Sequence, residues 1–429
     1  MLGLLYAIIM YLMYVRFKKA KSVAVIMVVF ITLTGLGSYF IGQMPSLEEI
    51  SDILMLAYTC LVIFLMCDGY KGYSKVVAVS GTEGSAFQLF SKSVLIFSLF
   101  SIAVNGFLLT MVLPMISDFG AWKGDMDEQQ SFFYNLPIPH WFITLSSILS
   151  AFSLFALPLH FYYLQKKEKK KAIWFGVGSL AMIVKGLLLF SRSAFVEFGL
   201  LYMVYTFLFY NSFTSRIKKL LKRLFVCAAV GAVLIFTAIS SNRFDDTGAL
   251  KIHEKSIIQD DVLYSYVDYG CQWFGDNFEL ARLYNYQPLG GTLSNAFIRT
   301  YFTHSDPSAV KDLRVKLWGG RATAFIGLYC IWLFDFGYIG SILLSLLFWY
   351  IAKRLRPKNG VMSTTSLFSV SVLLLLPLMS FSGNLLETTW YHDSLIILAI
   401  YALFAKNNKK RKIVSYNMNN NNGEKELCV

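Results

Sequence analysis

Long apolar runs recur along the whole chain and constrain its fold more than any other feature of the sequence. Each run is roughly 17–24 residues long, and about 20 apolar residues in a helix cross a hydrocarbon core about 30 Å thick. Charged residues make up only 15% of the 429-residue chain, whereas soluble domains contain about 25%. The sequence therefore predicts an all-α polytopic integral membrane protein.

The runs predict about eleven membrane-spanning helices, eight within residues 1–241 and three within 322–405. A long polar loop at 242–321 separates the two groups, and a polar tail follows at 406–429. The run at 322–351 could hold two spans, but a second span would place the basic residues after it on the wrong side. We expect instead an interfacial segment to about Leu333 and one span beginning near Asp335. The expected spans are roughly 2–15, 23–42, 50–66, 93–116, 141–164, 172–190, 194–210, 224–241, 334–352, 364–381 and 393–405.

Basic residues are concentrated in every second segment among those that join or flank these spans. Six alternating segments together hold 27 of the 39 Lys and Arg residues, while the opposite short loops hold just Lys123 and Arg192. Cytoplasmic loops carry such an excess of cations. We therefore expect the amino terminus outside and the carboxyl terminus inside. The net charge of +13 follows from this clustering, so no nucleic-acid partner is predicted.

The loop at 242–321 lies outside in this topology and is the segment most informative about function. It is too long for a connector. Its aromatic-rich stretches at 264–269 and 271–286 predict short amphipathic helices on or in the membrane interface. The loop also carries five arginines: Arg243, Arg282, Arg299, Arg314 and Arg321.

Outer arginines and aromatic residues suit a phosphorylated, sugar-bearing ligand. A planar guanidinium makes paired hydrogen bonds to phosphate oxygens, and several together can hold a pyrophosphate. The alternative is that these arginines anchor the loop to phospholipid headgroups. His304 in the same loop is either a general base with a pKa near neutrality or a surface histidine in a turn.

Arg192 lies in a tight outer hairpin between two apolar runs. Lys185 and Glu197 sit six residues before and after Ser191, so they share a depth on adjacent helices. A charge in the membrane requires pairing or a water-filled cavity. Either Lys185 and Glu197 form a structural salt bridge, or the hairpin forms a cationic lip for an anionic headgroup.

Other candidate sites are acidic. Asp125 and Asp127 match the short DxD pattern of metal-using glycosyltransferases, or form an acidic surface loop. Three carboxylates fall in the first outer loop, where many lipid-dependent glycosyltransferases keep a catalytic carboxylate; these are Glu48, Glu49 and Asp52. The six cysteines show no CxxC pair or metal-ligand spacing, so neither a disulfide framework nor a zinc site is implied. No cofactor is expected.

The whole pattern resembles the O-antigen and capsular oligosaccharide repeat-unit polymerases of the Wzy type. The resemblance rests on about eleven helices with a large outer loop in the second half. Two local features carry it further. Phe190-Ser-Arg-Ser begins a helix as the outer arginine hairpin does in many such polymerases, and Leu333-Phe-Asp-Phe-Gly-Tyr-Ile-Gly340 is similar to their DFG-x-x-G segment.

The resemblance implies a metal-independent glycosyltransferase of the bacterial inner membrane. Its donor and acceptor would be glycans linked to undecaprenyl pyrophosphate at the periplasmic face, and a chain-length regulator and a flippase would be possible protein partners. Arginines would stabilise the departing pyrophosphate, and a base would deprotonate the acceptor hydroxyl. The residues expected in these roles are Arg192, Arg282, Arg299 and Arg321 for pyrophosphate, with His304 as the base.

Three other functions remain open from the sequence. An O-antigen ligase shares the helix count, the outer loop and the lipid donor. A flippase or secondary transporter predicts internal repeats and charges near the membrane midplane, whereas the interior charges here cluster near the outer face. A membrane acyltransferase predicts a catalytic histidine within a helix, and none stands out.

Overall fold

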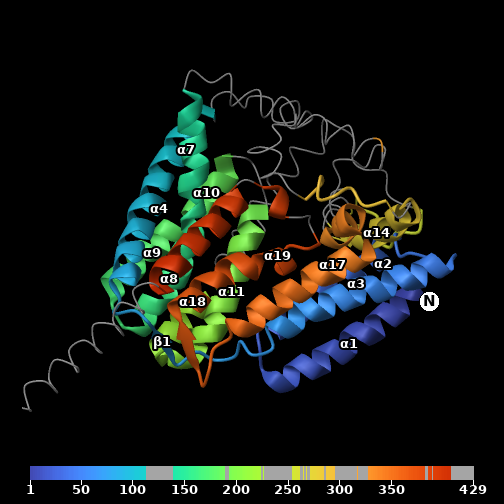
Figure 1. The fold of residues 1–429 in the computed structure, drawn as a ribbon, viewed down its shortest axis with the longest axis horizontal. Coiled ribbons are helices and arrows are strands. Elements are labelled where there is room, and N and C mark those ends of the chain that lie inside the picture. Colours follow the sequence, from blue (N-terminus) through green and yellow to red (C-terminus); the bar gives the residue numbers. More distant parts are fainter. Residues whose placement is uncertain are drawn as a thin grey trace, which may run out of the picture.

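A computed structural model gives the fold of the chain. It describes residues 1–112, 139–188, 193–223, 226, 254–260, 264, 267, 271–284, 287–294, 316, 327–381, 385–388 and 390–406. These residues are mostly helical, and the long helices lie side by side in a bundle, with α1, α3 and α17 together on one side and α4, α7 and α9 on the other (Figure 1).

The helices follow the apolar runs closely. Two 3₁₀ turns, η2 (Tyr210–Ser212) and η5 (Leu385–Glu387), accompany them, and residues 215–223 and 390–406 are also helical. The α-helices are α1 (Leu2–Ala20), α2 (Ala24–Phe40), α3 (Ile50–Gly69), α4 (Ser85–Val112), α7 (His140–Ala151), α8 (Ser153–Gln165), α9 (Lys169–Ser179), α10 (Ala181–Leu188), α11 (Ser193–Phe209), α14 (Trp273–Arg282), α17 (Leu328–Arg354), α18 (Thr364–Leu373) and α19 (Leu375–Leu378).

Within the described ranges, six helical stretches are long and apolar enough to cross a membrane. Two further apolar helices, Ala24–Phe40 and Thr364–Leu378, are shorter. The chain is therefore an α-helical membrane protein. The expected span at 224–241 lies outside the described residues apart from Val226. The six stretches are Ile50–Gly69, Ser85–Met111, Thr144–Gln165, Lys169–Leu188, Ser193–Ser212 and Leu328–Arg354.

Some neighbouring helices, such as α7 and α8 or α9 and α10, continue one another as a single apolar stretch. The described segments that join one stretch to the next gather at two ends of the bundle. At one end, Arg16 after the apolar part of α1 pairs with Asp68 of α3 at 3.1 Å. The indole N–H of Trp349 in α17 donates to the same carboxylate at 3.0 Å. The side-chain amide of Gln165 donates to the Val77 carbonyl at 2.7 Å. We call this the basic end, because the described basic segments lie here, and we call the other the opposite end.

The basic end contains a short sheet, which the expected all-α architecture did not include. Strands β1 (Ala78–Ser80) and β2 (Val361–Ser363) pair in parallel, with Val79 opposite Met362. The strands precede α4 and α18, which places the starts of these two helices side by side (Figure 1). Three-residue strands have little hydropathy pattern of their own, and neighbouring helices bring them together.

Helix α14, from the long loop, packs into the bundle. Its Trp273 and Phe274 side chains are fully buried. Phe274 lies against Tyr6 of α1, with ring centroids 4.4 Å apart, and Trp273 lies against Tyr329 of α17 at 5.4 Å. The helix is amphipathic, as expected, but protein rather than lipid covers its aromatic face.

Helix α17 contains a break at Gly337, which has φ 68° and ψ 179°. The carbonyl oxygens of Phe334 and Asp335 turn outward and accept the amides of Leu289 and Gly290, both at 2.9 Å. The expected boundary near Asp335 thus corresponds to a real interruption. The segment before it differs from expectation, because residues 328–334 are helical and buried inside the protein.

Candidate functional site

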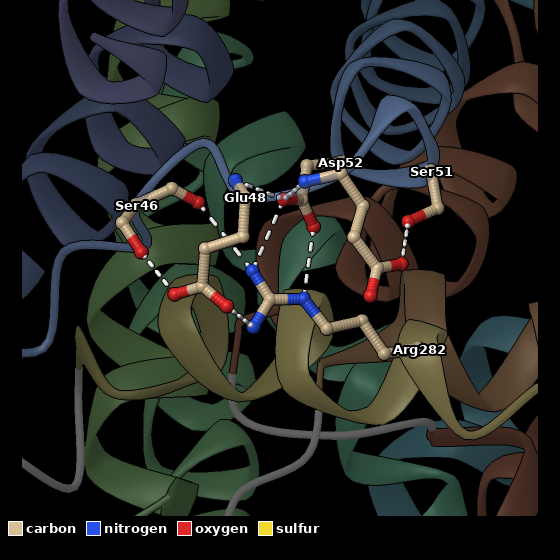
Figure 2. Close-up of polar contacts among 6 residues, drawn as sticks. Ser46, Glu48, Ser51, Asp52 and Arg282 are labelled. Carbon is tan, nitrogen blue, oxygen red and sulfur yellow. Dashed lines mark hydrogen bonds and ion pairs between the residues drawn. The ribbon is translucent and has the colours of Figure 1, made fainter.

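The most elaborate charged cluster in the described structure lies at the opposite end and joins α14 to the start of α3. Arg282 donates from Nε to Asp52 at 3.1 Å and from Nη2 to the other oxygen of that carboxylate at 3.0 Å. Its Nη1 pairs with Glu48 at 2.8 Å. Figure 2 shows the guanidinium held between the two carboxylates. The paired geometry with Asp52 is the strong form of this interaction.

The start of α3 fixes the carboxylates. Glu49 is the N-cap and Asp52 is the third helical residue, and they form a capping box that satisfies free amides at the helix end. Asp52 accepts the backbone amides of Glu48 at 2.9 Å and Glu49 at 3.0 Å. Its carboxylate is therefore oriented before Arg282 reaches it.

The docking of α14 places Arg282. A side chain at Gly275 would clash with the carbonyl oxygen of Gln43, so glycine lets α14 lie against the α2–α3 connection. The Ser38 hydroxyl in α2 donates to the Cys271 carbonyl just before α14. These contacts align the last turn of α14 with residues 46–52.

The exposed fraction of the side chains increases across the cluster from the inside to the outside. The side chain of Asp52 is 1% exposed, that of Arg282 is 24% exposed and that of Glu48 is 58% exposed. The hydrogen bond to Asp52 raises the pKa of Arg282, so the guanidinium stays charged. The cluster thus offers a fixed cation whose inner partner is buried and whose outer partner faces solvent.

Comparison with known proteins gives no match. No family model, curated protein or solved structure is significantly similar to this chain.

The structure describes only one of the five residues expected at the site. Arg282 lies in the cluster. Its partners are two of the three acidic residues that the sequence analysis placed in the first outer loop, Asp52 and Glu48. The other four expected residues lie outside the described residues, as do Asp125 and Asp127. These four are Arg192, Arg299, Arg321 and His304.

Lys185 and Glu197 lie near one another, as expected from the sequence, but they form no direct salt bridge within 4.0 Å among the described residues. Lys185 donates to the Ser147 hydroxyl at 3.4 Å. The charges of Asp393 and Glu197 both act on it. Asp393 was not among the candidates predicted from the sequence. The one feature that could have indicated it is its place as an acidic residue at the edge of an apolar run.

Asp335, in the DFG segment, stabilises the fold through hydrogen bonds to the backbone. It is fully buried, and its two carboxylate oxygens accept the amides of Leu293 at 2.9 Å and Ser294 at 2.6 Å. It thereby holds the turn at 287–294 against α17. In the described part of the chain, no group of three His, Cys, Asp or Glu side chains is arranged to hold a metal ion.

Proposed function

We propose that this protein polymerises undecaprenyl-pyrophosphate-linked oligosaccharide repeat units into O-antigen or capsular polysaccharide at the periplasmic face of the inner membrane. The observation that carries the proposal is the Arg282 cluster, in which a fixed guanidinium and a half-exposed carboxylate lie together at the end away from the basic segments. The proposal includes about eleven spans, with the amino terminus periplasmic and the carboxyl terminus cytoplasmic.

The sidedness of the site supports this assignment. Basic loops favour the cytoplasm, and they gather at the end opposite to Arg282. The cluster then faces the compartment in which lipid-linked repeat units are joined. The long loop that contributes α14 would be the periplasmic loop.

Arg282 can stabilise the charge of a leaving pyrophosphate. In the transfer step, the acceptor hydroxyl oxygen forms a bond with the anomeric carbon of the donor. The bond between that carbon and the pyrophosphate oxygen breaks, and its electron pair leaves with the pyrophosphate. A fixed cation beside the departing oxygen lowers the barrier for this step. Arg192, Arg299 and Arg321 are proposed to complete the pyrophosphate site.

Asp52 and Glu48 have different parts in this scheme. Asp52 is buried and holds Nε and Nη2 of Arg282 in place. Glu48 is 58% exposed, so a phosphate oxygen can displace it from Nη1. Once displaced, Glu48 can accept the proton of the acceptor hydroxyl. His304 remains the alternative base suggested by the sequence.

The test is deletion of the gene in its host, followed by a gel of surface polysaccharide and complementation. Wild type should restore long chains, whereas Arg282→Lys and Glu48→Gln, present at equal levels in the membrane, should leave single repeat units on the acceptor. We expect at least about a hundredfold loss of chain extension for Arg282→Lys, since a lysine cannot reproduce the paired geometry.

The chain offers a matched control in Arg16, which pairs with Asp68 at the basic end with a similar distance of 3.1 Å. Arg16→Lys should leave the chain-length distribution unchanged. Full-length glycan accumulating on undecaprenyl pyrophosphate in the deletion strain would identify a ligase instead. Single units retained on the cytoplasmic leaflet would identify a flippase.

A further inference from the structure

A cleft opens at the basic end between α2, α11 and the helix at 215–223. Its volume is about 590 Å³, within the range of about 300–1,000 Å³ typical of small-molecule sites. Ile26, Phe207 and Leu221 form part of an apolar wall. The cleft is remote from the Arg282 cluster, since α11 ends beside Val76, whose amide donates to the Leu208 carbonyl at 2.7 Å.

Three lysines border this cleft from one face of the short helix: Lys218, Lys219 and Lys222. Lys222 lies one turn after Lys218 and Lys219, at i+4 and i+3, and these spacings place residues on the same face of a helix. None of the ion pairs between described residues includes these lysines. Lys218 also lies over the ring of Tyr210, 4.6 Å from its centroid. The cleft thus joins an apolar wall to three ammonium groups that have no carboxylate partner among the described residues.

Thr206 provides a second, independent observation. It lines the cleft, and its buried hydroxyl oxygen has no hydrogen-bond partner in the described part of the chain. A buried hydroxyl without a partner costs free energy unless a ligand or water satisfies it. The lining of the cleft therefore combines cations, a residue with an unsatisfied hydroxyl and apolar side chains.

We propose that this cleft binds one anionic phospholipid from the leaflet at the basic end. The three lysines contact its phosphate, Thr206 contacts an ester or glycerol oxygen, and an acyl chain follows the apolar wall. A neutral lipid lacks the charge that the lysines require, and a soluble phosphate lacks the chain. Basic pockets between membrane helices on the cytoplasmic side bind such headgroups.

The experiment uses the full-length protein in detergent micelles with dioleoyl phosphatidylglycerol as the probe, and counts retained lipid by native mass spectrometry. The triple variant K218Q/K219Q/K222Q should bind this lipid at least about tenfold more weakly than wild type, because each lysine near an anionic surface contributes about a fivefold factor. Dioleoyl phosphatidylcholine should show no such difference.

The matched control is K166Q/K167Q/K170Q, which removes three exposed lysines from the α8–α9 connection and the first turn of α9 at the same end. It should change affinity less than about twofold. A second variant, Thr206→Trp, keeps every lysine but fills the cleft, and it should also abolish retention. It keeps the proposal testable should the triple variant fail to fold.

Three results would overturn the proposal. One is equal weakening by the two triple variants, which would show a general effect of charge. Another is unchanged binding in Thr206→Trp, which would place the lipid elsewhere. The third is equal competition by soluble glycerol phosphate, which would indicate a site for a free phosphate group.

Discussion

Asp52 shows how a single buried carboxylate can be stabilised at the end of a membrane helix. It accepts two hydrogen bonds from Arg282 and two from the backbone amides of Glu48 and Glu49. A buried charge is costly unless it is paired and hydrogen-bonded. Four donors meet that condition here, and each of them also restricts where Arg282 can lie.

Removing Arg282 should therefore destabilise the protein through Asp52. We expect Arg282→Met to lower the free energy of unfolding by about 2 kcal/mol, because it leaves a buried carboxylate without its cation. Replacing both partners, as in D52N/R282M, should recover a part of that loss. Unfolding of the purified protein by denaturant in detergent measures each value.

Arg16→Met is the control, since the Arg16 side chain is 51% exposed and surface pairs contribute about 0–1 kcal/mol. A loss for Arg282→Met no larger than for Arg16→Met would contradict the stabilising role of the inner pair. It would leave the proposed role in catalysis untouched, because that role concerns Nη1 and Glu48.

At the scale of elements, the break in α17 depends on a glycine. Gly337 has φ 68°, a conformation that side-chain-bearing residues rarely adopt. A Cβ there would also lie 2.9 Å from the Tyr284 hydroxyl. The break frees the carbonyls of Phe334 and Asp335 to bind the turn at 287–294.

Gly337→Ala should destabilise this junction by about 1–3 kcal/mol, from strain at positive φ and from the close contact. Gly106→Ala in α4 is the matched control, because a Cβ there meets nothing within 4 Å and alanine favours helix. Hydrogen exchange of the amides at 289–294 reports the effect. Equal protection in the two variants would show that the turn does not depend on the break.

At the scale of the whole molecule, polar contacts between distant segments gather at the two ends of the bundle. Arg16, Gln165 and Trp349 make their contacts at one end, and Arg282 and Asp52 make theirs at the other. This arrangement requires that the helices alternate in direction. It also separates the proposed glycan site from the proposed lipid cleft by the length of the bundle.

Labelling of single cysteines tests which end faces outside. Leu283→Cys, beside the Arg282 cluster, should react in intact cells with a maleimide that does not cross the inner membrane. Lys75→Cys, at the basic end, should react after the cells are opened. Both side chains are exposed, whereas the described native cysteines are buried. The reverse pattern would contradict the proposed topology, and with it the periplasmic site.

The helical membrane architecture could be predicted from the amino-acid sequence. Hydropathy is a local property, so the apolar runs at 50–66 and 194–210 predicted α3 and α11 closely. Arg282 was a candidate because an arginine can bind phosphate and because the long outer loop that contains it can be recognised from the sequence. A boundary near Asp335 could also be predicted, since Asp-Phe-Gly stands inside an apolar run.

Which of these residues contact one another depends on the three-dimensional packing of the helices and could not be predicted from the sequence. Arg282 and Asp52 are separated by 230 residues, and no local pattern pairs one carboxylate with one of several arginines. Other contacts also join segments that lie far apart in the sequence. Examples are the amides that bind Asp335, the position of Asp393 near Lys185 and the pairing of β1 with β2. Each depends on how helices pack, and packing depends on side-chain shape along whole faces rather than on any single segment.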